Sequence, residues 1–371
     1  MKTQFKIQNA NCKMQNNICA FRLAICHLPI TICFLLFALC ILPFASKTQS
    51  LGYYSLVQNN WGVYNAAAPN AYFLRVKQSK NFAAQNTLDV SYRQQWTGVP
   101  GSPANYNIRY ESLLANSADN SDYGVKFGGG LIGESVGPYL AHTIYGCYAY
   151  PLSFGGGYSK KYDNERLYIG ANVGFSYRRF DAANSNLFFE DPNAQGIKDY
   201  IQSQTFLNGQ SVFTVSPALF YFSYSRSFYV GISAPNLITT QTIGVKSHVF
   251  NTNPQVHLLI GGFSPDLTIQ PSLWVRWQYG TNYQTLFDNN PVSATLNVRT
   301  QIQETMIAGL GLSTSKLIHL QFGWNVGDFK KGYNKGRVRD MFINFSYDFP
   351  LLTATSYHFG QTGEINFMIA L

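Results

Sequence analysis

Apolar and small or polar residues alternate in the segment Leu167-Tyr-Ile-Gly-Ala-Asn-Val-Gly-Phe-Ser-Tyr177, and this alternation is the clearest indication of the fold. Leu167, Ile169, Ala171, Val173, Phe175 and Tyr177 share one face, while Gly170, Asn172, Gly174 and Ser176 share the other. A period of two predicts a β-strand with one apolar face. The same alternation recurs at 292–298, 306–312, 343–349 and 365–371.

The composition indicates where those apolar faces point. Charged residues make up 12% of the chain, about half of the roughly 25% usual in soluble domains. Aromatic residues reach 16%, yet the mean hydropathy is only -0.09. A helical membrane protein would be more apolar, a disordered chain poorer in aromatics, and a soluble enzyme richer in charge. We therefore expect β-structure with one face in lipid.

Segmentation on the alternation predicts fourteen strands. Their lengths and their even number suit a bacterial outer-membrane barrel. The predicted fold class is all-β, a transmembrane outer-membrane β-barrel of about fourteen antiparallel strands. The expected strands are 86–95, 104–112, 122–133, 138–150, 166–179, 209–222, 226–234, 253–262, 267–279, 291–300, 303–313, 317–326, 338–349 and 361–371.

The connections predict an orientation. If both barrel ends are periplasmic, the odd-numbered connections face outward and should be longer. The long connections 180–208, 235–252, 280–290 and 350–360 fit, whereas 151–165 and the basic 327–337 are exceptions.

Two expectations concern individual side chains. Trp274, Trp277 and Tyr279 suit an aromatic girdle at the membrane interface. Glu304, Glu364, Arg178, Arg276 and Arg299 are expected to face the barrel interior, and most other acidic residues to lie in turns.

Residues 1–50 resemble a secretory signal peptide, with a basic start, an apolar stretch from Leu23 to Phe44 and a polar exit. An uncleaved membrane anchor is the alternative, since this stretch is long enough to span a bilayer. We assign 51–371 to the barrel domain, with 51–85 as a lead-in and 86–371 as the strands. Removal of 1–50 takes away five basic residues and leaves only Cys147. The remaining charge gives no reason to expect nucleic-acid binding.

The residues contain no recognisable catalytic, cofactor-binding or metal-binding motif. Histidines are scattered without the spacing of a zinc site, and no nucleophile elbow or phosphate loop occurs. We therefore expect neither an enzyme nor a cofactor. A solute pore, a structural or adhesive barrel and, least favoured, a secreted lectin-like sandwich remain open.

Several motifs resemble one known family. Tyr92-Arg93-Gln-Gln95-Trp96-Thr-Gly98-Val-Pro100-Gly101-Ser-Pro103 is similar to the Y-R-x-Q-W-x-G-x-P-G-x-P signature of the PorP/SprF family of the type IX secretion system in Bacteroidota. Other similar stretches, in matching order, are Tyr64–Ala71, the turn ending at Gly137-Pro138, the strand 228–237 with Pro235-Asn236, and 363–367. Departures are Gly363 in place of histidine and the non-aromatic Leu371. The signature residues themselves are interpreted as determinants of the fold.

The resemblance implies an outer-membrane component of type IX secretion, a system associated with gliding motility. Its implied partners are other secretion components, membrane lipid and a secreted cargo protein, such as an adhesin, that carries a C-terminal secretion domain. The implied mechanism is docking, with 180–208 and 235–252 as the expected cargo-facing loops. An outer-membrane pore for small solutes is the alternative function.

Overall fold

The computed structural model describes residues that belong to one compact unit, 46–371. The described ranges are 54–71, 86–95, 97, 102–114, 124–136, 139–153, 165–180, 209–223, 227–243, 255–264, 268–278, 292–302, 305–314, 317–326, 340–350 and 361–371. The predicted signal peptide and most of the predicted outward loops lie outside them, so those assignments stay predictions.

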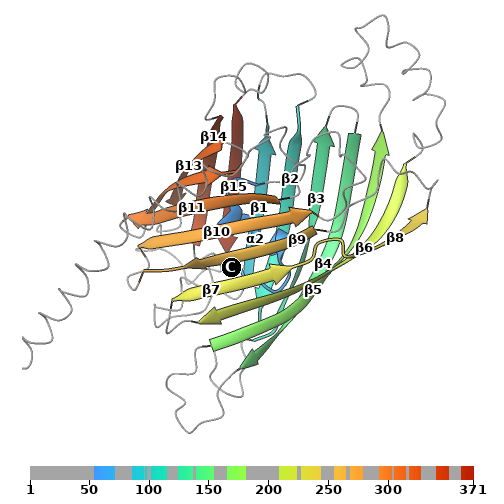
Figure 1. The fold of residues 1–371 in the computed structure, drawn as a ribbon, viewed down its shortest axis with the longest axis horizontal. Helices are drawn as coiled ribbons and strands as arrows, with labels where there is room; N and C mark the ends of the chain where they lie inside the picture. Colours follow the sequence, from blue (N-terminus) through green and yellow to red (C-terminus); the bar gives the residue numbers. More distant parts are fainter. Residues whose placement is uncertain are drawn as a thin grey trace, which may run out of the picture. The chain divides into compact units, whose positions relative to one another are not determined.

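The described chain is almost entirely antiparallel β-structure, with one short helix before the first strand (Figure 1). No helix in these ranges is long and apolar enough to cross a membrane. The elements are α2 (Val57–Tyr64), β1 (Asn86–Gln94), β2 (Ala104–Leu113), β3 (Lys126–Val136), β4 (Tyr139–Ser153), β5 (Glu165–Phe180), β6 (Gln210–Ser223), β7 (Phe228–Ser233), β8 (Ile238–Ile243), β9 (Gln255–Gly262), β10 (Ile269–Gln278), β11 (Val292–Ile302), β12 (Met306–Ser313), β13 (Leu317–Asn325), β14 (Asp340–Pro350) and β15 (Thr362–Ala370).

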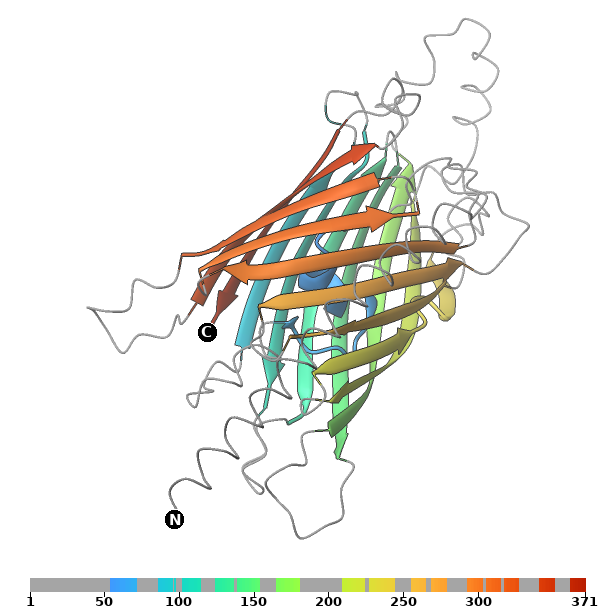
Figure 2. The same ribbon diagram turned by 60° about the vertical axis from the view of Figure 1, so that its left-hand side comes forward.

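The strands close into a ring, which Figure 2 shows from a second side. The last strand, β15, pairs with β1 from Thr87↔Ala370 to Gln94↔Gly363. The ring continues through the pairing of β5 with β6. β7 and β8 occupy successive parts of the same edge of β6, so together they fill one position. The fold is therefore a closed antiparallel barrel of fourteen positions, which confirms the predicted fold class and strand number.

The seventh position is interrupted at Pro235-Asn236. The backbone of Asn236 is left-handed, with φ 57°, and its N–H donates to Ser216 Oγ at 2.9 Å. The chain then resumes pairing with β6 at Val215↔Ile238. The prediction of one loop over 235–252 is thus wrong for 238–243: the Pro-Asn pair bends the strand out of register, and pairing restarts beyond it.

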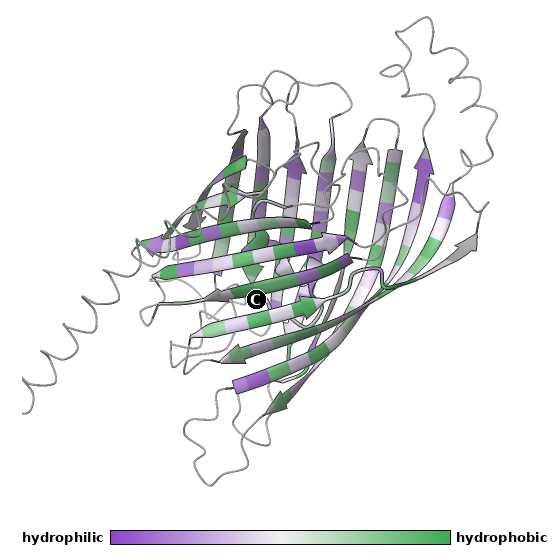
Figure 3. Ribbon diagram, viewed as in Figure 1, coloured by the Kyte–Doolittle hydropathy of each residue, from purple (hydrophilic) through white to green (hydrophobic). Residues whose placement is uncertain are grey.

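Hydrophilic and hydrophobic residues alternate along many strands, as the banding in Figure 3 shows, and the exposed fractions of the side chains assign the two kinds to opposite faces. Outward positions are large, apolar and exposed, for example Ile144 at 63%, Phe322 at 58% and Trp324 at 60%. Inward positions such as Arg93, Asn107 and His319 are polar and fully buried. This reverses the pattern of a soluble protein and suits a barrel whose outer face is in lipid.

One girdle assignment is wrong. Trp277 is half exposed on the outer face, but Trp274 is only 2% exposed and belongs to the buried aromatic cluster. The two positions differ by an odd number of residues, so a period of two places them on opposite faces. Tyr279 lies outside the described residues.

The lipid-facing assignment predicts the effect of a charge in the middle of β12. Leu310 is 50% exposed and pairs with Val298 and Leu320. We expect Leu310→Arg to lower the free energy of unfolding by about 2–4 kcal/mol, because the guanidinium meets hydrocarbon. Urea unfolding in lipid vesicles measures it, with Leu310→Ile as the control. Equal stability of the two variants would place this face outside the lipid.

The left-handed backbone at Asn236 gives a second prediction. Asn236→Val should lose about 1–2 kcal/mol of stability, because a β-branched residue is disfavoured at this φ. Asn236→Gly should stay close to the wild type, because glycine adopts positive φ without steric cost. Unfolding midpoints in detergent compare the three proteins, and an undiminished midpoint for the valine variant contradicts the argument.

Candidate functional site

Residues 54–71, here called the lumenal segment, lie inside the barrel. The helix α2 within it is enclosed by the strands in both Figure 1 and Figure 2. Its hydrogen bonds reach strands far apart around the ring, including Lys126 on β3, Gln270 on β10 and Glu364 on β15. The interior of the barrel is therefore the place where this chain gathers its buried polar groups.

Glu364 on β15 receives the start of α2. Its carboxylate accepts the backbone N–H groups of Ser55 at 2.5 Å and Leu56 at 3.1 Å, and the side-chain amide of Asn60 at 3.0 Å. The first turn of α2 contains no acidic residue of its own. A carboxylate at a helix N-terminus accepts hydrogen bonds from free N–H groups and interacts favourably with the positive end of the helix dipole. Glu364 thus supplies from the wall the cap that the helix lacks.

Asp348 on β14 joins three further groups. It accepts from Ser55 Oγ at 2.5 Å, from Arg93 Nη2 at 3.1 Å and from His319 Nδ1 at 2.7 Å. Arg93, His319 and Asp348 are all at most 1% exposed. Because buried charges require compensation, this cluster couples three strands to one serine of the lumenal segment.

Ser55, His319 and Asp348 are the three residue types of a hydrolase catalytic triad. The order of their hydrogen bonds differs from that of a triad. In a triad the histidine lies between the carboxylate and the hydroxyl and accepts the hydroxyl proton. Here the Ser55 hydroxyl donates to Asp348 itself. The arrangement therefore ties Ser55 of the lumenal segment to β14 and differs from the hydrogen-bond order of a triad.

A second charged cluster lies on β1, β2 and β3. Arg109 pairs with Asp89 at 3.2 Å, and Lys126 pairs with Glu111 at 3.0 Å. The Lys126 ammonium also donates to the carbonyls of Ala66 at 2.9 Å and Ala68 at 2.5 Å. These two carbonyls belong to the lumenal segment, so the wall holds its backbone directly.

The same cluster approaches the helix closely. Arg109 donates to the Asn59 carbonyl at 2.8 Å. A Cβ added at Gly62 would lie 2.4 Å from Glu111 Oε1 and 2.7 Å from Arg109 Nη1. Glycine at this position is what permits the contact between α2 and the charged wall.

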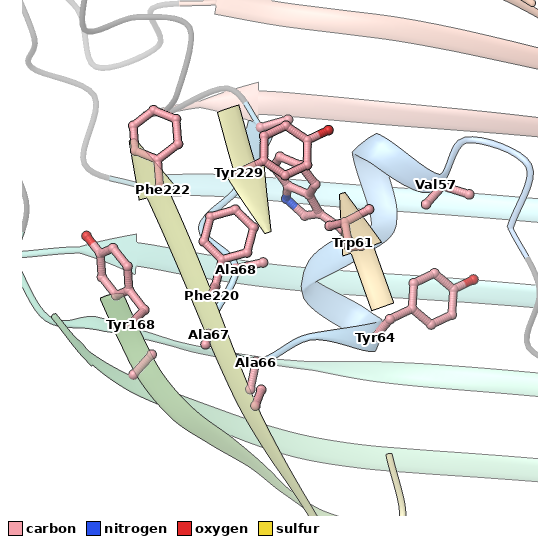
Figure 4. Packing of buried hydrophobic residues seen from close by; sticks show 14 of the residues in the cluster. Val57, Trp61, Tyr64, Ala66, Ala67, Ala68, Tyr168, Phe220, Phe222 and Tyr229 are labelled. Carbon is pink, nitrogen blue, oxygen red and sulfur yellow. The ribbon is translucent and has the colours of Figure 1, made fainter. Parts of the chain in front are cut away.

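The opposite side of α2 packs on aromatic side chains of β6, β7 and β10 (Figure 4). The ring of Trp61 lies 5.7 Å from Phe220 and 5.0 Å from Tyr229, both edge to face. Tyr64 lies 4.9 Å from Trp274. Such aromatic pairs contribute about 0.5–1.5 kcal/mol each beyond the area they bury. The helix is therefore held by charges on one side and by aromatic rings on the other.

The interior of the barrel is filled around the lumenal segment. A water-filled pore exposes its inward side chains, whereas Asn297, Arg299, Gln321 and Asn344 are each 1–2% exposed. A cavity of about 20 Å³ lies between the lumenal segment and the wall, lined by Asn59, Asn70, Asp89, Arg299 and Asn344 among others. That volume holds about one water molecule.

Sequence reasoning placed some interior residues correctly. Glu364, Arg178, Arg276 and Arg299 are buried on inward faces, whereas Glu304 lies outside the described residues. The expectation that most other acidic residues lie in turns is wrong for Asp89, Glu111 and Asp348, which are on strands. Their signal was present in the alternation, because Asp89 has the same parity as Ser91 and Arg93.

The signature residues separate into different surroundings. Tyr92 is 45% exposed on the outer face, whereas Arg93 and Gln95 are buried inside. The Gln95 N–H donates to the Pro103 carbonyl at 2.8 Å, and Pro235 and Asn236 interrupt the seventh position. Outside the described residues lie Trp96, Gly98, Pro100, Gly101, Gly137 and Pro138.

The lumenal segment is the main feature that sequence reasoning missed. Its eighteen residues carry no charge and no strand alternation, and from the sequence they are assigned only to the lead-in 51–85. Within the ranges that the structure describes, no three His, Cys, Asp or Glu side chains lie together as a metal site would require.

Comparison with known proteins identifies a family. A model described as "Type IX secretion system membrane protein PorP/SprF" matches residues 82–368. No curated protein sequence matches the chain.

Several solved structures of outer-membrane barrels are similar at low identity. CymD, a monoaromatic hydrocarbon channel, is 10% identical, with a TM-score of 0.43 over 85% of this chain and 97% of that one. A TodX deletion mutant, also a hydrocarbon channel, is 9% identical, with a TM-score of 0.40 over 77% and 90%. The outer membrane phospholipase A of Escherichia coli is 6% identical, with a TM-score of 0.32 over 77% and 92%.

The Asp348 cluster yields a prediction about coupling. Asp348→Asn should lower the free energy of unfolding by about 3–5 kcal/mol, because it removes the carboxylate that pairs with buried Arg93. The double variant with Arg93→Met should cost less than the sum of the two single changes. Urea unfolding of the four proteins completes the cycle. Strictly additive losses would show that the two groups do not interact.

Proposed function

The chain belongs to the PorP/SprF family of type IX secretion system membrane proteins, and we propose that within this system it docks secreted cargo at the outer membrane. The family assignment and the barrel together place the protein in the outer membrane as a component of this secretion apparatus. The cargo would be a protein with a C-terminal secretion domain, such as an adhesin. Binding to other secretion components on the periplasmic side belongs to the same proposal.

The observation that carries this proposal is the extent of the family match. It runs from residue 82 to residue 368 and so includes β1 through most of β15. The whole wall of the barrel, and not one motif within it, is what the family shares with this chain.

The filled interior favours docking over passage of solutes. Inward side chains around the ring are buried, and the lumenal segment occupies the space between them. A permanently open solute pore would need those side chains to face water. The pore is therefore the second candidate, and it would require the lumenal segment to leave.

We also propose that the protein acts without catalysis. Among the described residues, the interior group formed by Ser55, His319 and Asp348 combines hydroxyl, imidazole and carboxylate, and its hydroxyl is bound to the carboxylate. In a Ser-His-Asp triad the imidazole, and not the carboxylate, accepts the hydroxyl proton. The interior contacts serve to hold the chain together.

The outward connection between β5 and β6 is the expected cargo-facing loop. Deleting 183–205 should abolish surface display of cargo, while the heat-modifiable migration of the folded barrel stays unchanged. Shortening the basic connection 327–337, expected on the periplasmic side, is the matched control for loop length. Normal cargo display by a well-folded barrel that lacks 183–205 would refute this assignment.

A further inference from the structure

We propose that the lumenal segment is a displaceable internal ligand: it closes the barrel, and the space it fills is a binding site for an uncharged peptide with an aromatic anchor. This inference stands apart from the secretion role, because it concerns what fills the interior and not which cargo is carried. Four features of the contacts support it.

The first feature is the division of charge. The lumenal segment, Tyr54 to Ala71, contains no charged side chain. Every charge at its surface comes from the strands. The Glu364 carboxylate binds groups of the segment, whereas three other carboxylates pair with cations of the wall: Asp348 with Arg93 and His319, Asp89 with Arg109, and Glu111 with Lys126. Departure of the segment would therefore leave these ion pairs intact. Water could replace the neutral donors and acceptors that it removes.

The second feature is the kind of contact that the wall makes. Lys126 and Arg109 donate to backbone carbonyls of residues 66, 68 and 59, and Glu364 accepts backbone N–H groups of residues 55 and 56. Backbone groups are common to all peptides, so these contacts recognise a peptide chain as such. Specificity then falls to the asparagine side chains and to the aromatic pocket.

The third feature is an anchor in a preformed pocket. Trp61 is 1% exposed and lies against Phe220 and Tyr229, which belong to strands β6 and β7. Phe220 and Tyr229 also stack on each other at 5.8 Å, so the pocket has an order of its own. A buried aromatic side chain in such a pocket is the usual centre of a peptide-binding interface.

The fourth feature is an imperfect fit. Buried polar atoms of the segment, namely Tyr54 Oη, Gln58 Oε1 and Trp61 Nε1, have no hydrogen-bond partner in the described structure. An eight-residue helix is also too short to be stable alone in water. The segment is thus bound by its surroundings and not by its own folding, as a ligand is.

The test measures ion conductance in planar bilayers and alkylation of Cys147 in detergent. Cys147 is 6% exposed and shares the buried cluster with Ala66, Ala67 and Ala68. Mass spectrometry of the peptide that contains Cys147 reports its modification separately from any other thiol. The wild-type protein should conduct little, and its Cys147 should react slowly.

Three variants displace the segment by different means. These are deletion of 54–71, Trp61→Ala and Gly62→Leu, the last of which drives a side chain into Glu111 and Arg109. Each should raise conductance and speed alkylation of Cys147, by roughly tenfold or more for the two substitutions. Gly363→Leu is the matched control, because an added Cβ there meets nothing within 4 Å. It should behave like the wild type.

A synthetic peptide of residues 54–71 tests the binding site itself. Added to the deletion variant, it should lower conductance and protect Cys147, whereas the same peptide with Trp61→Ala should act more weakly. Wild-type conductance equal to that of the deletion variant would overturn the proposal, as would unchanged alkylation in all three variants. Failure of the peptide to bind, or of the deletion variant to form a heat-modifiable barrel, would overturn it as well.

Discussion

A barrel in lipid must satisfy every backbone hydrogen bond within its own wall. Lipid offers no partner to an unpaired N–H or C=O group, so a sheet that crosses it must have no free edge. The chain meets this demand by pairing β1 with β15 along nearly their whole length. Once the ring is closed, every strand has one face toward lipid and one toward the interior. The period of two in the sequence is a direct consequence.

A closed barrel of this size also has an interior that must be filled. Inward positions are polar, and a ring of fourteen positions encloses more space than its own side chains fill. Ion pairs between strands, such as Arg109–Asp89 and Lys126–Glu111, fill part of this space. The remaining space takes an uncharged stretch of chain whose backbone and amides bind those charges. Neutrality of the lumenal segment matters, because an added charge would upset pairs that the strands already balance.

The parts of the structure that depend on local period were predictable from the sequence, and the parts that depend on long-range contact were not. Alternation located the strands, and parity placed Glu364 and Arg299 inside. The odd spacing between Trp274 and Trp277 also places their side chains on opposite faces of the strand. The girdle prediction grouped them only because both are aromatic. The resumption of pairing at Ile238 escaped prediction, because Pro235-Asn236 reads as an end and the β-strand after it shows no clear apolar face.

Neither the alternation of residues nor the local signals of a helix start predicts the lumenal segment. Its helix has no acidic residue in the first turn and no side-chain cap, so the local signals of a helix start are missing. The cap comes from Glu364, more than three hundred residues later in the chain. A contact that joins the two ends of a sequence leaves no pattern in either end.

The signature stretch that begins at Tyr92 gains a physical explanation from these contacts. Tyr92 faces lipid, while Arg93 binds both Asp348 of β14 and Ser55 of the lumenal segment. One dipeptide therefore connects the outer surface, the closing strands and the interior chain. Replacing Arg93 with another inward residue could preserve the barrel and still lose the link to Ser55. The start of the signature stretch therefore stabilises the contact between the wall and the lumenal segment as well as the wall itself.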